Sequence, residues 1–164
     1  MNETASRPLI YVHGLLSSGQ SFKANLLRGY FPHILTPDFN GSLEERMALL
    51  DALLAGGSGW VIIGSSLGGL MGAMFTCQHP QQVHKLILLS PALIWPDFAQ
   101  ALPPPVQVPT VVYHGQKDTL IPLELVRSLA EQVFLDLTFH QVDDDHSLHN
   151  TVQAIDWIAL VSDT

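Results

Sequence analysis

Ser66 is the strongest candidate for chemistry in this sequence, because residues 64–68 have the spacing G-x-S-x-G. A serine that attacks a carbonyl projects from a strained turn between a strand and a helix, where the positions two before and two after it have no room for a side chain. Around Ser66 both positions are glycine, whereas Ser65 has bulkier residues there. The rule therefore predicts Ser66 as the nucleophile. The segment has neither the G-x-G-x-x-G spacing of a dinucleotide site nor the lysine of a P-loop, which argues against a phosphate-binding turn.

Asp118 and His146 are the residues that could activate this serine. A serine hydroxyl is a weak nucleophile at neutral pH, so it needs an imidazole to take its proton and a carboxylate to orient and stabilise that imidazole. Ser66, Asp118 and His146 each follow a predicted strand. Because the carboxyl ends of parallel strands meet at one edge of a sheet, we expect the three side chains to lie together there.

Two neighbouring groups compete for these roles. His149 could replace His146 as the base, but it should lie one turn into the last helix, whereas His146 lies in the loop after the last strand. The aspartates at 143–145 could replace Asp118, but the acid must approach the imidazole from the adjacent strand end, so we favour Asp118 and interpret the run as a solvated loop and helix cap. The same cluster with its His-x-x-His pair is a weak indication of a metal site. We expect no metal and no cofactor.

Strand and helix patterns alternate along the chain. Apolar runs predict strands at 8–12, 33–36, 60–63, 83–89, 110–113 and 136–142. Helical periodicity predicts helices at 20–28, from the capping box at 42–45 to the glycines at 56–57, and at 67–78, 122–133 and 147–161. Because the connections are short, we expect an α/β fold with about six mostly parallel strands and helices on both faces of the sheet.

The composition narrows the class of protein further. A chain of 164 residues, 47% hydrophobic, is long enough for one domain spanning 1–164. The net charge of −8 argues against nucleic acid or an anionic membrane surface as a partner. The single cysteine, Cys77, fits a reducing compartment, and the N-terminal MNETASRP lacks the features of a signal peptide, so we predict a cytoplasmic protein. The oligomeric state stays open.

The chain resembles the α/β-hydrolase superfamily in four segments. These are YVHGLLSS at 11–18, GSSLGG at 64–69, YHGQKDTLIP at 113–122 and DDDHSL at 143–148, and the chain order Ser, Asp, His is the one this topology requires. In HGLLSSGQSFKANLL, residues 13–27, the chain is most similar to the small YqiA-like esterases. The resemblance implies a serine hydrolase that cleaves carboxylic esters or thioesters through an acyl-enzyme. Thioester cleavage, acyl transfer on the same triad, or ligand binding without catalysis are the alternatives.

The same resemblance implies where the oxyanion and the substrate bind. By the superfamily pattern, the backbone N–H groups of Leu15 and Leu67 form the oxyanion hole. Compared with larger relatives, the chain lacks the first two strands and reduces the cap to residues 92–109, so we expect an open cleft and a preference for short, soluble acyl esters. The apolar side chains in and near these loops either line an acyl pocket or cover the sheet, and the candidates for substrate contact are Leu16, Leu93, Ile94, Trp95 and Phe98.

Overall fold

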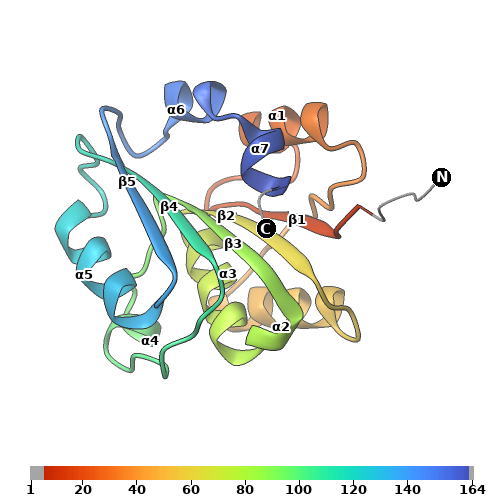
Figure 1. The fold of residues 1–164 in the computed structure, drawn as a ribbon, viewed down its shortest axis with the longest axis horizontal. Helices are drawn as coiled ribbons and strands as arrows, with labels where there is room; N and C mark the ends of the chain where they lie inside the picture. Colours follow the sequence, from red (N-terminus) through yellow and green to blue (C-terminus); the bar gives the residue numbers. More distant parts are fainter. Residues whose placement is uncertain (1–5, 163–164) are drawn as a thin grey trace.

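A five-stranded parallel sheet forms the centre of the computed structural model, which describes residues 6–162 (Figure 1). Its strands are β1 (Leu9–Val12), β2 (Trp60–Ser65), β3 (Val83–Leu89), β4 (Thr110–Gly115) and β5 (Leu137–Val142), in that spatial order. All four pairings are parallel, so the carboxyl ends of the strands share one edge. Residues 1–5 of the N-terminal segment MNETASRP, on which the signal-peptide prediction rests, lie outside the described residues.

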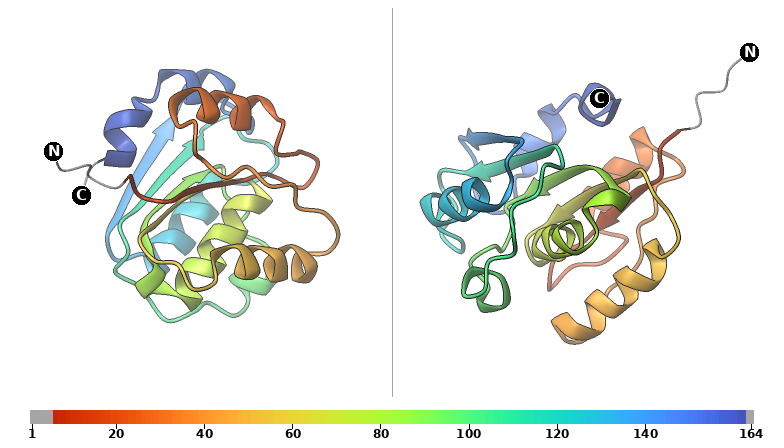
Figure 2. Two further views of the ribbon diagram at one scale, coloured as in Figure 1. Left: turned by 90° about the vertical axis from the view of Figure 1, so that its right-hand side faces the viewer. Right: turned by 60° about the horizontal axis from the view of Figure 1, so that its bottom comes forward.

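Helices cover both faces of this sheet (Figures 1 and 2). One face carries α1 (Phe22–Tyr30), α6 (His149–Ala154) and α7 (Trp157–Ser162), and the other carries α2 (Leu43–Leu54), α3 (Leu67–Gln78), α4 (Pro96–Ala99) and α5 (Leu123–Val133); a short 3-10 helix spans Pro80–Gln82. The two layers enclose separate cores, as β1 illustrates: Ile10 and Val12 belong to the core that contains residues of α2, α3 and α5, whereas Tyr11 belongs to the core that contains residues of α1, α6 and α7. This double cover explains why the inner strands are apolar on both sides.

Local sequence signals account for several of these elements. The hydroxyl of Ser42 accepts a hydrogen bond from the backbone N–H of Glu45 at 3.1 Å and caps α2, as the capping box predicts. The bounds of β3 and α3 agree with the prediction. In α3, Gly72 lies close under the sheet, because a Cβ there would be 3.1 Å from Ile62 Cγ2 and 3.3 Å from Leu86 Cδ1.

The predicted strand at 33–36 is reduced to a single bridge, which leaves five strands rather than about six. Leu35 pairs with Ile10 on the outer side of β1, where Tyr11 N–H donates to Leu35 O at 2.8 Å and Leu35 N–H donates to Leu9 O at 3.0 Å. Pro32 and Pro37 flank this segment. Because proline has no N–H to donate and fixes its own φ, the pairing does not extend in either direction.

The last predicted helix is divided in two. Ile155 has an extended backbone with ψ of 133°, and Asp156 Oδ1 then accepts a hydrogen bond from Ala159 N–H at 3.0 Å at the start of α7. The division turns Trp157 inward, where its indole N–H donates to Val152 O at 2.8 Å, and it leaves Ala159 exposed. The helical periodicity of 147–161 therefore predicted the helical character but not the break.

Candidate active site

Ser66 forms a sharp turn between β2 and α3. Its backbone has φ of 56° and ψ of −117°, a region that non-glycine residues rarely adopt. A Cβ on Gly64 would lie 2.4 Å from Gly68 O, and a Cβ on Gly68 would lie 2.0 Å from Val12 O. These distances explain why only glycine fits on either side of Ser66, and the turn directs the serine side chain beyond the edge of the sheet.

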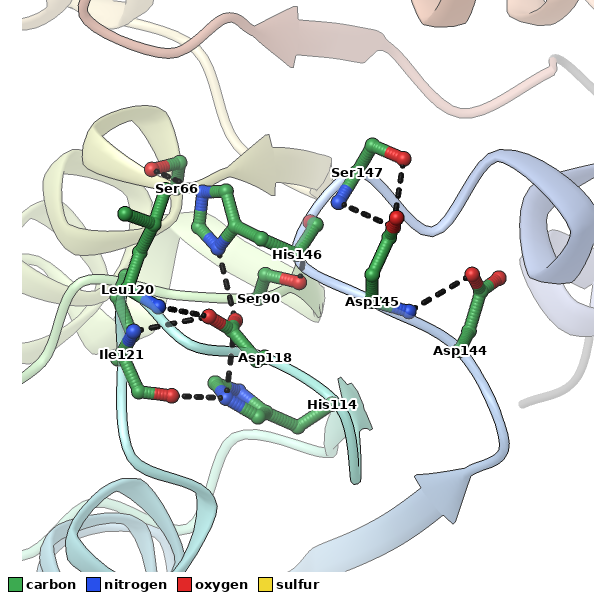
Figure 3. A network of polar contacts seen from close by, with 10 residues as sticks. All are labelled: Ser66, Ser90, His114, Asp118, Leu120, Ile121, Asp144, Asp145, His146 and Ser147. Carbon is green, nitrogen blue, oxygen red and sulfur yellow. Dashed lines mark hydrogen bonds and ion pairs between the residues drawn. The ribbon is translucent and has the colours of Figure 1, made fainter.

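His146 and Asp118 extend from Ser66 as a chain of hydrogen bonds (Figure 3). His146 Nε2 lies 3.2 Å from Ser66 Oγ, and His146 Nδ1 lies 2.8 Å from Asp118 Oδ2. An ionised carboxylate can only accept hydrogen bonds, so the partners assign the proton to Nδ1 and leave Nε2 to accept from the serine hydroxyl. The loops after β2, β4 and β5 thus bring together the three residues that the sequence selected.

Three hydrogen-bond donors hold the side chain of Asp118. Its side chain is 0% exposed, and Oδ1 accepts from the backbone N–H groups of Leu120 at 2.9 Å and Ile121 at 2.8 Å. Oδ2 faces His146 Nδ1 and also lies 3.3 Å from Nε2 of His114. A buried carboxylate needs such partners to remain ionised, and the three donors also fix its direction towards His146.

His114 supports this carboxylate from below. The imidazole is fully buried, and its Nε2–H donates to Ile121 O at 2.9 Å, so the ring braces the turn that also supplies the two backbone donors to Asp118. Burial lowers the pKa of His114, although the hydrogen bond to Ile121 and the charge of Asp118 oppose that effect. His114 is therefore neutral at neutral pH. Its Nδ1 has no hydrogen-bond partner among the described residues.

Ser90 holds the loop that carries His146, a role that the sequence did not reveal. Its hydroxyl donates to His146 O at 2.9 Å, and its own backbone has φ of 46° at the end of β3. The residue is 1% exposed. The available signal was a polar residue that follows the apolar run 86–89 and comes just before Pro91, which indicates a strained strand end at the functional edge.

The loop after β1 lies directly against Ser66. A Cβ on Gly14 would be 3.3 Å from Ser66 Cβ, so the following residue, Leu15, is beside the serine. His13 holds this loop in place: its Nδ1 donates to Gly14 O at 2.7 Å and its Nε2 accepts from Phe39 N–H at 2.8 Å. Within residues 6–162, the N–H groups of Leu15 and Leu67 donate no hydrogen bond, which leaves both available to a ligand.

The competing residues have other partners. His149 is exposed, and its ring packs on that of Phe22 with 4.3 Å between centroids. The three aspartates have separate bonds: Asp143 with Lys117 Nζ at 2.9 Å, Asp144 with Thr151 N–H at 2.9 Å, and Asp145 with Ser147 Oγ at 2.7 Å. In the described part of the chain, no three His, Cys, Asp or Glu side chains are grouped so as to hold a metal ion. Over the same residues, no helix combines the length and apolar character that a membrane crossing requires.

A cavity of about 540 Å³ opens beside Ser66. It lies between the start of α1 and the loop after β5, and its walls come from Tyr11, 14–17, 21–23, Ser65, Ser66, Leu120 and 146–147. Leu16, a predicted substrate contact, is in this wall and is 99% exposed. The sequence did not point to the contribution of α1, whose Phe22 lines the cavity and is 47% exposed.

The other four predicted substrate contacts do not line this cavity, which corrects that expectation. Leu93 and Phe98 are 0% and 2% exposed, and both belong to the core shared by α2, α3 and α5. Ile94 and Trp95 are partly buried against the same core. The segment after β3 therefore covers the face of the sheet opposite to α1, because that face offers the apolar contacts that its side chains need.

Comparisons with known proteins agree with this architecture. Residues 36–107 match the family described as alpha/beta hydrolase fold. A Xanthomonas campestris protein, described as a hydrolase of the α/β superfamily, is 25% identical with a TM-score of 0.72, over 90% of this chain and 92% of that one. Alpha/beta hydrolase domain-containing protein 10 from mouse is 17% identical with a TM-score of 0.75, over 96% and 90% of the two chains.

A third similar structure is an esterase from Pyrococcus furiosus, which is 17% identical with a TM-score of 0.77 and covers 95% of this chain and 81% of its own. No curated protein sequence matches this chain. From the family match and the similar structures, the chain therefore has the α/β-hydrolase fold.

Proposed function

We propose that the protein is a serine hydrolase that cleaves carboxylic esters. The observation that carries the proposal is the hydrogen-bonded chain from Ser66 through His146 to Asp118, with 3.2 and 2.8 Å between the bonded atoms, at the wall of a cavity. Only a reaction that needs an activated hydroxyl makes use of all three groups in this order. The presence of an esterase among the similar structures agrees with this reaction class.

In the first half of the reaction, Ser66 Oγ attacks the carbonyl carbon of the ester while His146 Nε2 takes the hydroxyl proton. Asp118 stabilises the imidazolium that results. The N–H groups of Leu15 and Leu67 hold the negative oxygen of the tetrahedral intermediate, and the positive end of the α3 dipole adds to this stabilisation. The bond between the carbonyl carbon and the leaving oxygen then breaks, and His146 gives its proton to that oxygen.

In the second half, water replaces the alcohol. His146 takes a proton from the water, whose oxygen attacks the acyl carbon, and the bond to Ser66 Oγ breaks as the proton returns to the serine. The products are a carboxylic acid and an alcohol, and the enzyme is regenerated. Thioesters can follow the same steps with a thiol as the leaving group.

The walls of the cavity support a small substrate. Between β3 and β4 the only helix is α4, which has four residues, and the cavity is bounded by loops rather than by a separate cap. This arrangement favours short, soluble acyl esters and agrees with the resemblance to the small YqiA-like esterases. Because His146 reaches Ser66 and the segment 92–109 leaves the cavity open, the arrangement favours catalysis over ligand binding alone.

Replacement of the nucleophile tests the proposal. Ser66→Ala should lower kcat/KM for 4-nitrophenyl acetate and butyrate by about 10³-fold or more, because the step that forms the acyl-enzyme is lost. A fluorophosphonate probe should label the wild-type protein at Ser66, as read by mass spectrometry of its peptides. Parallel assays with acetyl and butyryl thioesters determine which leaving group the enzyme prefers.

The control is Ser58→Ala, the same change at an exposed loop position before β2. This variant should retain both hydrolysis and labelling, and both variants should have the thermal unfolding midpoint of the wild type within a few degrees. Full activity or full labelling in folded Ser66→Ala would remove Ser66 from the reaction. A predicted cytoplasmic location is not addressed by these assays and stays a prediction.

A further inference from the structure

Lys23 lies in the wall of the same cavity as Ser66 and His146. It is the second residue of α1 and is half-buried. Among the described residues its ammonium forms no hydrogen bond and no ion pair within 4.0 Å, whereas Lys117 and Lys85 both have a close oxygen partner. A partly desolvated cation without a protein partner is unfavourable, and a bound anion would relieve this cost.

The two nearest acidic residues do not satisfy this ammonium. The charges of Asp144 and Asp145 raise the pKa of Lys23, but burial lowers it by more. Both carboxylates are engaged elsewhere: Asp144 accepts from Thr151 Oγ1 at 2.8 Å and Asp145 accepts from Ser147 Oγ at 2.7 Å. They moderate the potential at Lys23 without occupying its hydrogen-bonding positions.

Hydroxyl groups accompany Lys23 along the cavity wall. Tyr11, Ser21 and Ser65 all line it, and contacts with the two serine hydroxyls partly offset the burial that raises the pKa of Tyr11 to about 12. Tyr11 is therefore a neutral phenol that can donate a hydrogen bond at any ordinary pH. An ammonium together with several hydroxyl donors is a set of groups that suits an oxyanion of the ligand.

Apolar side chains form the outer part of the cavity. Leu15, Leu16 and Leu120 are 49%, 99% and 69% exposed, although all three line the cavity near Ser66. Leucines at this degree of exposure can bury apolar surface against a ligand. The cavity thus combines a polar wall that contains Lys23 with an apolar rim.

We propose that the preferred substrates are esters that carry a carboxylate a few bonds from the scissile carbonyl, and that Lys23 pairs with this carboxylate. The inference rests on the proposed hydrolase function and specifies its substrate class. A singly charged group fits better than a phosphate monoester, because one cation faces the cavity, two aspartates lie nearby and the protein has a net charge of −8. The carboxylate belongs either to the acyl group or to the alcohol.

Matched pairs of esters test this specificity in two arms. In the acyl arm, 4-nitrophenyl hemiglutarate is compared with 4-nitrophenyl valerate. In the alcohol arm, 3-acetoxybenzoate is compared with its methyl ester. In one arm the wild type should favour the charged ester by roughly tenfold or more in kcat/KM. A preference of this size is expected from one charge-assisted hydrogen bond in a partly desolvated site. The arm that shows the preference assigns the carboxylate to the acyl group or to the alcohol.

Variants of Lys23 attribute the preference to its charge. Lys23→Met, which keeps the length of the side chain, should reduce the ratio of charged to neutral ester by roughly tenfold. Lys23→Arg should retain most of the ratio. The matched control is Arg7→Gln, which removes one positive charge at an exposed position. Arg7 precedes β1, whereas the cavity lies beyond the carboxyl end of that strand, so this variant should keep the wild-type ratio.

The carboxylate proposal is overturned if the kcat/KM ratio of charged to neutral ester is near one in both arms, or if a high ratio persists in Lys23→Met. Hydrolysis of the neutral esters would still support the hydrolase function in either case. If no ester is hydrolysed, the hydrolase function fails and binding decides the proposal. In that case monomethyl glutarate is titrated into Ser66→Ala by NMR and compared with methyl valerate. A preference for the charged ligand that Lys23→Met removes supports the carboxylate site, and equal binding of both ligands rejects it.

Discussion

Two connections leave the edge of the sheet where Ser66 lies: one packs into the core and the other lines the cavity. The segment 92–109 after β3 is rich in apolar and aromatic residues that were expected either to line an acyl pocket or to cover the sheet, and Leu93 and Phe98 are buried in the core. The segment 13–23 after β1 is more polar, yet it forms much of the cavity beside Ser66. Apolar composition alone therefore does not identify a binding wall, because a core and a pocket attract the same side chains.

The difference arises from the face of the sheet that each segment joins. The segment after β3 packs with α2, α3 and α5, where large side chains fill the space under the strands. The cavity instead opens beside Tyr11, which belongs to the core of α1, α6 and α7. There the first turn of α1 and the loop after β5 leave a cavity between them, and the loop after the first strand forms much of its wall.

Removal of the base should have the largest effect on this site. His146→Gln should lower kcat by about 10³-fold or more with little change in the free energy of unfolding, because the side chain is partly exposed and acts on the serine proton. Steady-state kinetics and thermal unfolding measure the two quantities. His149→Gln is the matched variant and should remain active. Loss of activity in His149→Gln with retention in His146→Gln would reverse the assignment of the base.

Truncation in the segment after β3 should affect stability instead. Leu93→Ala removes a side chain that is 0% exposed, and it should cost about 2–5 kcal/mol of unfolding free energy through lost burial and a residual cavity. The KM for short esters should stay within about twofold of the wild type. Urea unfolding and kinetics together test this, and a raised KM at unchanged stability would return Leu93 to the substrate site.

The corresponding change after β1 should show the reverse pattern. Leu16→Ser alters a side chain that is 99% exposed at the rim of the cavity, so the unfolding free energy should change by less than about 0.5 kcal/mol. KM for butyrate esters should rise roughly twofold to fivefold, because less apolar surface of the substrate is buried. An unchanged KM over a series from acetate to hexanoate would show that Leu16 does not contact substrate.

The smallest effect concerns His114 and acid stability. Burial lowers its pKa below the ordinary value of 6.5, so the unfolded chain takes up the proton first as the pH falls. This contribution to stability is complete above about pH 6.5 and is lost as the pH falls from there towards the lowered pKa of the folded state. His114→Gln should therefore lose unfolding free energy less steeply below pH 6.5 than the wild type.

Denaturant unfolding at several pH values between 5 and 7.5 gives the slope of unfolding free energy against pH for each protein. The pKa of His84 is also lowered, but His84 is present in both proteins, so its effect cancels in the comparison. Identical slopes would show that His114 binds its proton equally well in the folded and unfolded chains. The same variant should retain measurable hydrolysis, because His114 supports Asp118 through the turn without contacting Ser66 or His146 in the hydrogen-bond network.

Local signals in the sequence were sufficient for much of the fold. The glycines around Ser66, the capping box at Ser42 and the apolar run of β3 each depend on a few adjacent residues, so the elements they define could be located from sequence. The juxtaposition of Ser66, Asp118 and His146 followed from topology, because parallel strands end at one edge.

What the sequence could not supply depends on distant contacts. The break at Ile155 arises because Trp157 packs into the core of α1, α6 and α7. The segment 33–36 forms only one bridge because it lies between two prolines and pairs only with the edge strand β1. Lys23 and Tyr11 enter the cavity only through the placement of α1 over β1. No spacing in the sequence reports that placement.

Because Gly68 lies tightly against the end of β1, the proposed hydrolysis should depend on the docking of this strand on the sheet. β1 pairs with β2 at the edge of the sheet, in a register that joins Val12 to Gly64, and its carbonyl groups lie where a side chain on Gly68 would lie. Leu15, whose N–H is a proposed oxyanion donor, lies beside Ser66 only when this edge strand has docked. In a refolding experiment, ester hydrolysis should therefore return together with the docking of β1, after the local helices have formed.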